Sequence, residues 1–393
     1  MNPNDFRCPT AGQVIHTATG HVAFVPAPLP PTLVYDADLV LTLSQADAAL
    51  SELSGLGRHL PNPHLLIAPY TRREAVLSSR IEGTHTNISA LLLEEARDEA
   101  PTGESPRRSS GDREDMREVR NYVAALDHGV GRLHELPLSL RLVREVHERL
   151  MRGVRGDRAT PGEFRRSQNW IGPAGCTLAT APYVPPPPEE MTQALHDWET
   201  FLHQHGTLPD LIQCALLHEQ FEAIHPFLDG NGRVGRLLIL LFLMERGRLT
   251  QPLLYLSAYI EAHRQDYYDL LQRVRTDGDW NGWLRFFLTG VTATARAAIR
   301  QAGELTDLRE TFRARLRDRA KALTLVDQLF INPYLTVSRA SKILGVSNQT
   351  ARQTVLTLER NGLLAEMTGR AWGRIYLAEP ILRAIENVPD FGN

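Results

Sequence analysis

The strongest restriction on how this chain can fold comes from a short polar segment between two apolar stretches near its middle. Residues 224–236 read Ile-His-Pro-Phe-Leu-Asp-Gly-Asn-Gly-Arg-Val-Gly-Arg. Apolar residues recur at helical spacing over residues 211–224 and predominate again after the segment, up to residue 246. Because proline disfavours helical backbone at the residue before it, the first helix must end at or next to His225. The sequence therefore predicts two buried helices joined by a tight turn at Asp229-Gly230.

The start of the second helix is predicted to be an anion site. The free N–H groups of Asn231, Gly232 and Arg233, together with the positive end of the helix dipole, favour negative charge there. Arg233 and Arg236 lie three residues apart on one helix face, so both guanidinium groups can reach the same oligophosphate. We therefore expect this helix end to bind a nucleotide polyphosphate.

Other phosphate and metal motifs fail on the same stretch of sequence. Residues 230–235 match G-x-G-x-x-G, but the dinucleotide-binding form of that motif follows a strand, whereas here a helix precedes it. No G-x-x-x-x-G-K-[ST] segment occurs, which excludes a P-loop NTPase. The pair His218-Glu219 is followed by Glu222 where a zinc-protease helix needs a second histidine.

The residue types around the turn suit chemistry on a nucleotide. Asp229 can bind Mg²⁺, which bridges phosphate oxygens. Backbone N–H groups and the two arginines can offset charge that develops on the phosphates. Histidine has an ordinary pKa near neutrality, so His225 is the candidate general base for an incoming hydroxyl group.

Residues 225–236 read H-P-F-x-D-G-N-G-R-x-x-R, and here the sequence resembles the Fic-domain proteins, whose motif it matches without a departure. The resemblance implies a mainly α-helical core with a short β-hairpin flap. It implies transfer of AMP from ATP, with Mg²⁺, onto a Ser, Thr or Tyr hydroxyl of a target protein and of the chain itself, with release of pyrophosphate. The implied catalytic base is His225 and the implied metal ligand is Asp229. The other implied ATP-binding residues are Gly230, Asn231 and Gly232 at the α-phosphate, Arg233 at the β-phosphate, Arg236 at the γ-phosphate, Val234 and Gly235 between them, and Tyr267 and Tyr268 beside the adenine.

Two alternatives to AMP transfer stay open. Doc-like relatives transfer phosphate instead and carry a lysine where this chain has Gly232, and a glycine there leaves room for the α-phosphate. The other alternative is a DNA-binding regulator whose Fic-like core senses or modifies a partner.

The segment that begins Gly162-Glu163-Phe164-Arg165 and continues to residue 184 resembles the family's flap, which holds a target segment as an added strand.

An upstream segment resembles the family's inhibitory motif. Ser78 to Gly83 contains S-x-x-x-E-G. On its own this pattern also describes a surface glutamate followed by a glycine that caps a helix. Beside a complete catalytic motif it predicts that Glu82 forms a bidentate pair with Arg236, which occupies the arginine needed by the γ-phosphate. The enzyme would then be self-inhibited.

The C-terminal residues read as a separate winged helix-turn-helix. Gly345 is expected to end one helix and Ser347 to cap the next, which spans residues 348–360. The first turns of that helix present Asn348, Gln349 and Arg352, side chains suited to DNA bases and phosphates. Residues 322–393 carry a net charge of only +1, so DNA binding does not follow automatically.

Composition and segment boundaries complete these expectations. The chain of 393 residues has a net charge of −3, so any nucleic-acid contact must be local. Its N-terminus lacks a secretory signal, and its most apolar window of eight residues is far shorter than a membrane span. Its three cysteines form no C-x-x-C pair. A soluble cytoplasmic protein without membrane contact is expected, and a homodimer stays open. The expected units are an N-terminal arm and helical region with the inhibitory motif (1–98), a linker (99–115), the catalytic core (116–295), a connecting helix (296–321) and a winged helix domain (322–393).

Overall fold

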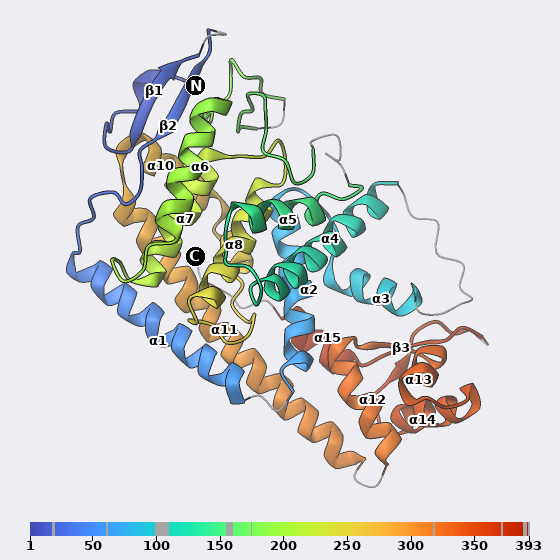
Figure 1. Cartoon of the computed structure of the whole chain (residues 1–393). Helices are drawn as coiled ribbons and strands as arrows, with labels where there is room; N and C mark the ends of the chain where they lie inside the picture. The colour runs from blue at the N-terminus through green and yellow to red at the C-terminus, as the bar shows by residue number, and fades with distance from the viewer. Residues whose placement is uncertain are drawn as a thin grey trace.

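The structure is a computed structural model that describes residues 1–17, 20–59, 62–98, 110–154, 160–173, 175–316, 319–370, 372–387 and 391. The chain is mainly α-helical, as the sequence predicted (Figure 1). Its helices are α1 (Ala37–His59), α2 (His64–Ile81), α3 (Ile88–Asp98), α4 (Ser110–Arg132), α5 (Leu140–Leu150), α6 (Pro188–Leu202), α7 (Asp210–Ile224), α8 (Asn231–Glu245), α9 (Ser257–Ala262), α10 (Arg264–Asp277), α11 (Trp280–Arg315), α12 (Ala320–Ile331), α13 (Val337–Leu344), α14 (Asn348–Arg360) and α15 (Glu379–Glu386). Its strands are β1 (Gly12–His16), β2 (Val22–Pro26), β3 (Tyr334–Thr336), β4 (Ala365–Glu366) and β5 (Ile375–Leu377). Among the helices so described, none is long and apolar enough to cross a membrane.

Helices α7 and α8 form the centre of the molecule and carry the motif at their junction. Every residue from Leu211 to Ile224 is buried, and these include polar side chains such as His218 and Glu219. Figure 1 shows these two helices enclosed by α4 and α5 on one side and by α6 and α11 on the other. The predicted helix end at His225 is confirmed, since α7 ends at Ile224, and α8 begins at Asn231.

The first residues of the predicted N-terminal arm form a β-hairpin. Strands β1 and β2 form an antiparallel hairpin that pairs Gly12 with Pro26 and His16 with Val22. Apolar and β-branched residues on both sides of the turn explain the pairing, because they fit a half-buried pleated surface. The Phe24 ring packs against the Tyr183 ring at 6.1 Å, and the Phe24 N–H donates to the Val184 carbonyl at 2.9 Å.

The hairpin expected over residues 164–184 is shorter than predicted. It consists of a single antiparallel bridge between Ile171 and Tyr183. Pro173 and Pro182 flank this bridge and have no N–H group to extend a ladder. The proline run that follows leads directly into α6, which begins at Pro188.

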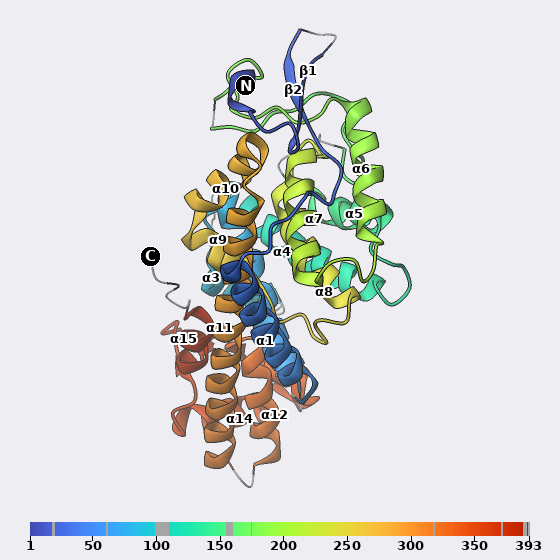
Figure 2. The same ribbon diagram turned by 90° about the vertical axis from the view of Figure 1, so that its left-hand side faces the viewer.

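Two long helices, α1 and α11, lie side by side, and α11 leads from the helices around α7 to the C-terminal unit. Helix α11 has 36 residues and runs through position 296, where the sequence suggested the start of a separate connecting helix. Helix α1 packs along it, as the two views in Figures 1 and 2 show. Of the expected linker, residues 99–109 lie outside the described residues and residues 110–115 open α4.

The C-terminal unit has the element order expected of a winged helix. Strands β3, β5 and β4 form an antiparallel sheet in that spatial order, beside α12, α13 and α14. The predicted caps are confirmed: Gly345 adopts a left-handed conformation with φ of 61°, and the Ser347 hydroxyl accepts the Thr350 N–H at 3.3 Å. The unit packs against α2 and α3, where the Asn332 amide donates to the Leu92 carbonyl at 2.9 Å.

Candidate active site

The turn between α7 and α8 is rigid because its own side chains complete its hydrogen bonds. The Asn231 side chain accepts the Phe227 N–H at 2.8 Å and donates to the Phe227 carbonyl at 2.8 Å. Gly230 has φ of 79°, which favours glycine, and caps α8. His225 also has positive φ, 49°, which is uncommon for a residue with a side chain. The resemblance also implies a contact between Asn231 and the α-phosphate; in this structure its side chain shapes the loop.

A second histidine, which the sequence analysis missed, connects this loop to the start of the flap segment. His147 on α5 is fully buried and stacks on the Phe227 ring at 3.7 Å. Its Nδ1 accepts the Gly162 N–H at 2.9 Å, so the ring proton sits on Nε2, which donates to the Asp229 carbonyl at 3.0 Å. Burial lowers the pKa of His147 to about 4. The ring is therefore a neutral bridge at neutral pH.

His225 is held neutral as well. Burial and the nearby positive charges of Arg165 and Arg275 lower its pKa to about 3, against the opposing effect of the Glu82 carboxylate. A neutral imidazole is the form that can accept a proton.

The N-terminus of α8 presents the amide groups predicted for an anion site. The first hydrogen bond within the helix runs from the Val234 N–H to the Gly230 carbonyl at 3.0 Å, which leaves the three preceding amides without helical partners. Gly232 lies against the Glu82 carboxylate, and a Cβ at this position would collide with it. Glu82 therefore lies directly over the glycine turn.

Both predicted phosphate-binding arginines are buried, but they extend in different directions. The Arg233 Nη1 donates to Glu118 on α4 at 3.1 Å, and its Nη2 lies 3.6 Å from the Asp229 carboxylate. The Arg236 Nη2 donates to Glu82 at 2.7 Å. Each guanidinium group is thus paired with a carboxylate that an anion would have to replace or share.

The contact between Glu82 and Arg236 corrects one expectation. The predicted bidentate pair is wrong, because a single Glu82 oxygen contacts the arginine through Nη2, while Nε and Nη2 also donate to Ser78. The Ser78 hydroxyl accepts the Arg236 Nε–H at 2.8 Å and its carbonyl accepts the Nη2–H at 2.9 Å. Burial opposes ionisation of Glu82, but Arg236 and more distant positive groups outweigh it, so its pKa is lowered. Gly83, with φ of 99°, lets the chain turn away from α2 immediately after the glutamate.

The remaining four predicted ATP-binding residues lie outside the glycine turn and its two arginines. Val234 is buried in the core, and a Cβ on Gly235 would meet Glu222 and Phe221 on α7, so these two positions serve helix packing. Tyr267 is buried, with its hydroxyl bonded to His218 Nε2 at 2.9 Å. Tyr268 is partly exposed, and the Arg264 guanidinium lies 5.8 Å from its ring centre.

The Asp229 carboxylate fits a Mg²⁺ ion that is held mainly by phosphates. Its side chain is 49 % exposed, and one oxygen accepts the Gly230 N–H at 2.6 Å. Within the described ranges, three or more His, Cys, Asp or Glu side chains nowhere gather into a ready-made metal cage. Mg²⁺ is commonly bound by one or two carboxylates together with substrate phosphates, and Asp229 can supply that one carboxylate.

The flap segment supplies two further residues that sequence reasoning did not single out as functional. Arg165 and Asn169 are buried and donate hydrogen bonds to main-chain carbonyls of the loop at His225 and Phe227. A buried arginine is unusual, but burial is not visible in a sequence. Only the position of Arg165 within the flap motif could have drawn attention to it.

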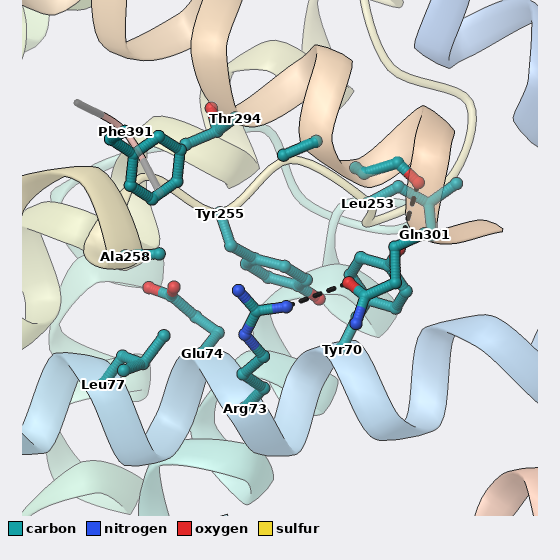
Figure 3. A pocket seen from close by; sticks show the side chains of 12 residues that line it. Tyr70, Arg73, Glu74, Leu77, Leu253, Tyr255, Ala258, Thr294, Gln301 and Phe391 are labelled. Atoms are coloured by element: carbon teal, nitrogen blue, oxygen red, sulfur yellow. Dashed lines mark hydrogen bonds between the residues drawn. The ribbon is translucent and has the colours of Figure 1, made fainter. Parts of the chain in front are cut away.

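A small cavity between α2 and α11 is separate from this site (Figure 3). Its volume of about 30 Å³ is water-sized, and none of the predicted site residues lines it. In Figure 3 Arg73 reaches across to Gln301, and Phe391 closes one side.

The predicted DNA-binding residues Asn348, Gln349 and Arg352 are exposed on α14, in the C-terminal unit and away from the α7–α8 junction (Figure 1).

Comparisons with known proteins agree with this geometry. The family model described as Fic/DOC family N-terminal matches residues 40–131, and the model described as Fic/DOC family matches residues 137–243. A protein adenylyltransferase Fic of Aedes aegypti is 34 % identical over 152 residues, which are 38 % of this chain and 27 % of that protein. A probable protein adenylyltransferase of Aquifex aeolicus is 25 % identical over 244 residues, which are 62 % of this chain and 68 % of that protein.

A solved structure shares the fold over most of the chain. The crystal structure of a Fic family protein from Desulfovibrio desulfuricans aligns with a TM-score of 0.58 and 19 % identity, and covers 89 % of this chain and 98 % of that one. The match to the mosquito relative spans less than a third of that protein's length. The two family models together cover half of the chain, and the second contains the whole motif from His225 to Arg236. The chain therefore belongs to the Fic/DOC family.

Proposed function

We propose that the chain is an adenylyltransferase that moves AMP from ATP to a hydroxyl side chain of a target protein. The observation that carries this proposal is the placement of a neutral His225 at the end of α7, directly before the glycine-lined N-terminus of α8 and its two buried arginines. The relatives named as protein adenylyltransferases support it.

In the proposed reaction the target hydroxyl oxygen attacks the α-phosphorus of ATP. The bond between that phosphorus and the oxygen that bridges to the β-phosphate breaks, and pyrophosphate leaves. The hydroxyl proton moves to His225, whose pKa is expected to rise beside a bound triphosphate because negative charge favours the imidazolium. The α8 amides hold the α-phosphate, and Arg233 and Arg236 offset charge on the phosphates beyond it. Asp229 would hold Mg²⁺, which supplies neutralising charge to the phosphates when bound.

Labelled ATP tests this reaction. Wild-type protein with Mg²⁺ should acquire label from [α-³²P]ATP and none from [γ-³²P]ATP. His225→Ala should lower AMP transfer by about 10²–10⁴-fold, the usual effect of losing a positioned acid–base group, with ATP binding retained. His196→Ala, which removes an exposed histidine on α6, is the matched control. Transfer at the wild-type rate by His225→Ala would contradict the assignment of His225 as the general base. Label from the γ-phosphate alone would indicate phosphate transfer instead of AMP transfer.

We further propose that Glu82 restrains the enzyme in the described conformation. Its carboxylate pairs with Arg236 and lies over Gly232, so it occupies both the arginine assigned to the γ-phosphate and the space above the glycine turn. ATP can then bind only with its phosphates displaced from the orientation needed for attack.

DNA binding by the C-terminal unit is a second candidate function. The observation that favours it is the exposure of Asn348, Gln349 and Arg352 on the first turns of α14. If the full chain binds duplex DNA, affinity should fall steeply between about 50 and 200 mM salt as counterions are released. Arg352→Ala should weaken binding and lower the salt slope by about 1, measured by fluorescence anisotropy.

The control for this test is Arg383→Ala, which removes an exposed arginine on α15. No shift of any duplex at low salt would leave the unit as a protein-contact or packing module.

A further inference from the structure

This inference rests on the proposed function and concerns what holds His225 in place. His225 and Thr160 are the two non-glycine residues with positive φ in the described part of the chain. Such a conformation persists only where surrounding contacts fix it. At His225 one such contact is the bond of 2.9 Å from its own N–H to the Phe221 carbonyl, which caps α7, and others come from the flap segment, sixty positions earlier in the sequence.

Residues 225–230, between α7 and α8, are here called the catalytic turn because of the role proposed for His225. Arg165 binds three consecutive carbonyl groups where α7 ends and this turn begins. Its side chain is 2 % exposed. The Nε–H donates to the His225 carbonyl at 3.0 Å, Nη2 donates to the Ile224 carbonyl at 3.4 Å, and the main-chain N–H donates to the Pro226 carbonyl at 2.9 Å. The remaining donors reach the carbonyls of Ser167 and Pro186 within and beside the flap segment.

Asn169 adds a second contact to the same turn. Its amide donates to the Phe227 carbonyl at 2.9 Å and to the His225 carbonyl at 3.3 Å. Two buried side chains from one short segment therefore converge on the carbonyl of the proposed base. This convergence fixes the peptide plane after His225 and with it the direction of the imidazole.

The charge of Arg165 also faces His225. Its donors are taken by carbonyl oxygens, and in the described ranges it forms no ion pair with a carboxylate. Burial lowers the pKa of Arg165 to about 10, so it remains charged at neutral pH. Other groups facing His225 are Arg275 of α10, which also disfavours the imidazolium, Glu82 at the end of α2, which favours it, and the Glu222 main chain on α7.

We infer that Arg165 is the positioning residue of the catalytic turn, which sets the left-handed backbone and the aim of His225. Its positive charge adds to the effect of burial in disfavouring the imidazolium. Asn169 assists in the first of these roles. The flap segment thus acts on the base directly, in addition to any contact it makes with a target.

Two substitutions separate the geometric from the electrostatic role. Arg165→Lys keeps the charge but cannot reach several carbonyls at once, whereas Arg165→Gln loses both. The matched control is Arg166→Gln, because the Arg166 side chain is 88 % exposed and pairs only with exposed Glu163 among the described residues. All variants are made in the full chain, with and without Glu82→Gly.

Steady-state kinetics and histidine NMR give the readouts. Both Arg165 variants should lower kcat for AMP transfer by about 10–100-fold with KM for ATP nearly unchanged, the size expected for a misplaced catalytic group. The acidic limb of kcat/KM should move to higher pH in Arg165→Gln and stay in place in Arg165→Lys. The ¹³Cε1 signal of His225, assigned by its loss in His225→Ala, should show the same difference in its titration midpoint.

Three outcomes overturn the inference. They are a kcat for Arg165→Gln within about threefold of Arg166→Gln, a His225 titration that does not move in Arg165→Gln, and equal shifts in the glutamine and lysine variants. The NMR titration needs no turnover, so it tests Arg165 even if the wild type transfers no AMP, which would contradict the proposed function alone. If circular dichroism shows that Arg165→Gln does not fold, Asn169→Ala replaces it, and an unchanged kcat in that variant overturns the positioning role.

Discussion

Three histidines around the catalytic turn are kept neutral by their surroundings. Burial lowers the pKa of His147 to about 4, and burial lowers those of His218 and His225 to about 3. The three rings differ in what they do, since His147 joins two loops, His218 bonds the Tyr267 hydroxyl, and His225 is the proposed base. A neutral ring can both accept and donate a hydrogen bond, which an imidazolium cannot. Burial therefore sets the protonation state of each histidine, and with it the hydrogen bonds that the ring can form.

His147 should make the stability of the protein depend on pH. Its folded-state pKa of about 4 lies below the ordinary value of 6.5, so the unfolded chain binds a proton more readily between these values. Stability from this residue is therefore complete above pH 6.5 and declines as pH falls toward 4, by about 3 kcal/mol in all. His147→Gln, which can keep both hydrogen bonds without titrating, should reduce that decline in urea unfolding measured from about pH 7 to about pH 4.

The control for this measurement is His196→Gln on the exposed side of α6. An equally steep decline in His147→Gln and in the wild type would show that His147 does not contribute.

At the scale of elements, the end of α2 and the first turns of α8 meet in one polar contact, through which the proposed restraint acts. Ser78 and Glu82 lie one helical turn apart, so both reach Arg236 from the same face of α2. Glu82 follows the last residue of α2, so its replacement leaves the helix intact. The contact can therefore be removed without disturbing either helix.

Glu82→Gly should raise AMP transfer and self-modification by about 5–150-fold, the usual range of a coupling between two sites. The gain is expected because Arg236 and the space above Gly232 become free for the phosphates. The double variant Glu82→Gly with Arg236→Ala should lose most of this gain. Transfer of label from [α-³²P]ATP measures both.

Glu95→Gln is the control for the charge change, since Glu95 pairs with Arg72 elsewhere on α2. The restraint is wrong if Glu82→Gly is no more active than the wild type, or if its gain survives the loss of Arg236.

Across the whole molecule, the C-terminal unit shares its core with the rest of the chain. The main cluster of buried apolar residues extends from Leu39 to Ile385 and includes residues of the C-terminal unit, whereas two small clusters lie around the N-terminal hairpin and the flap segment. Polar contacts add to it, such as the hydrogen bond of 2.6 Å between the Ser89 and Tyr334 hydroxyl groups. Helices α12 and α15 lie against α2, the helix that leads to Glu82 (Figure 1).

Because of this shared core, the full chain should unfold in a single calorimetric transition. Asn332→Ala removes the bond to the Leu92 carbonyl and the bond from the Tyr334 N–H, so it should cost about 1–3 kcal/mol. The midpoint of the one transition should fall by a few degrees. Gln353→Ala, on the exposed face of α14, should leave it unchanged. Two transitions, of which Asn332→Ala lowers only one, would show that the units fold separately.

Local signals in the sequence were enough to place the ends of the central helices and the caps of the C-terminal ones. Pro226 ends α7, Gly345 ends α13 and Ser347 caps α14, since each acts on backbone within a few residues of itself. The residue types of the catalytic turn likewise indicated an anion site before any fold was known. The assignment of Glu82 as inhibitory depended on the family resemblance.

Contacts between distant segments depended on the folded chain. The bond from Arg165 to the His225 carbonyl joins residues 60 positions apart, and that from Arg236 to Glu82 joins residues 154 apart. The pairing of β2 with the flap segment through Phe24 is of the same kind. No local pattern specifies which buried donor meets which acceptor, because that depends on how the helices pack around α7 and α8. Burial likewise sets the charge state of His147 and His225, so their chemistry follows from packing.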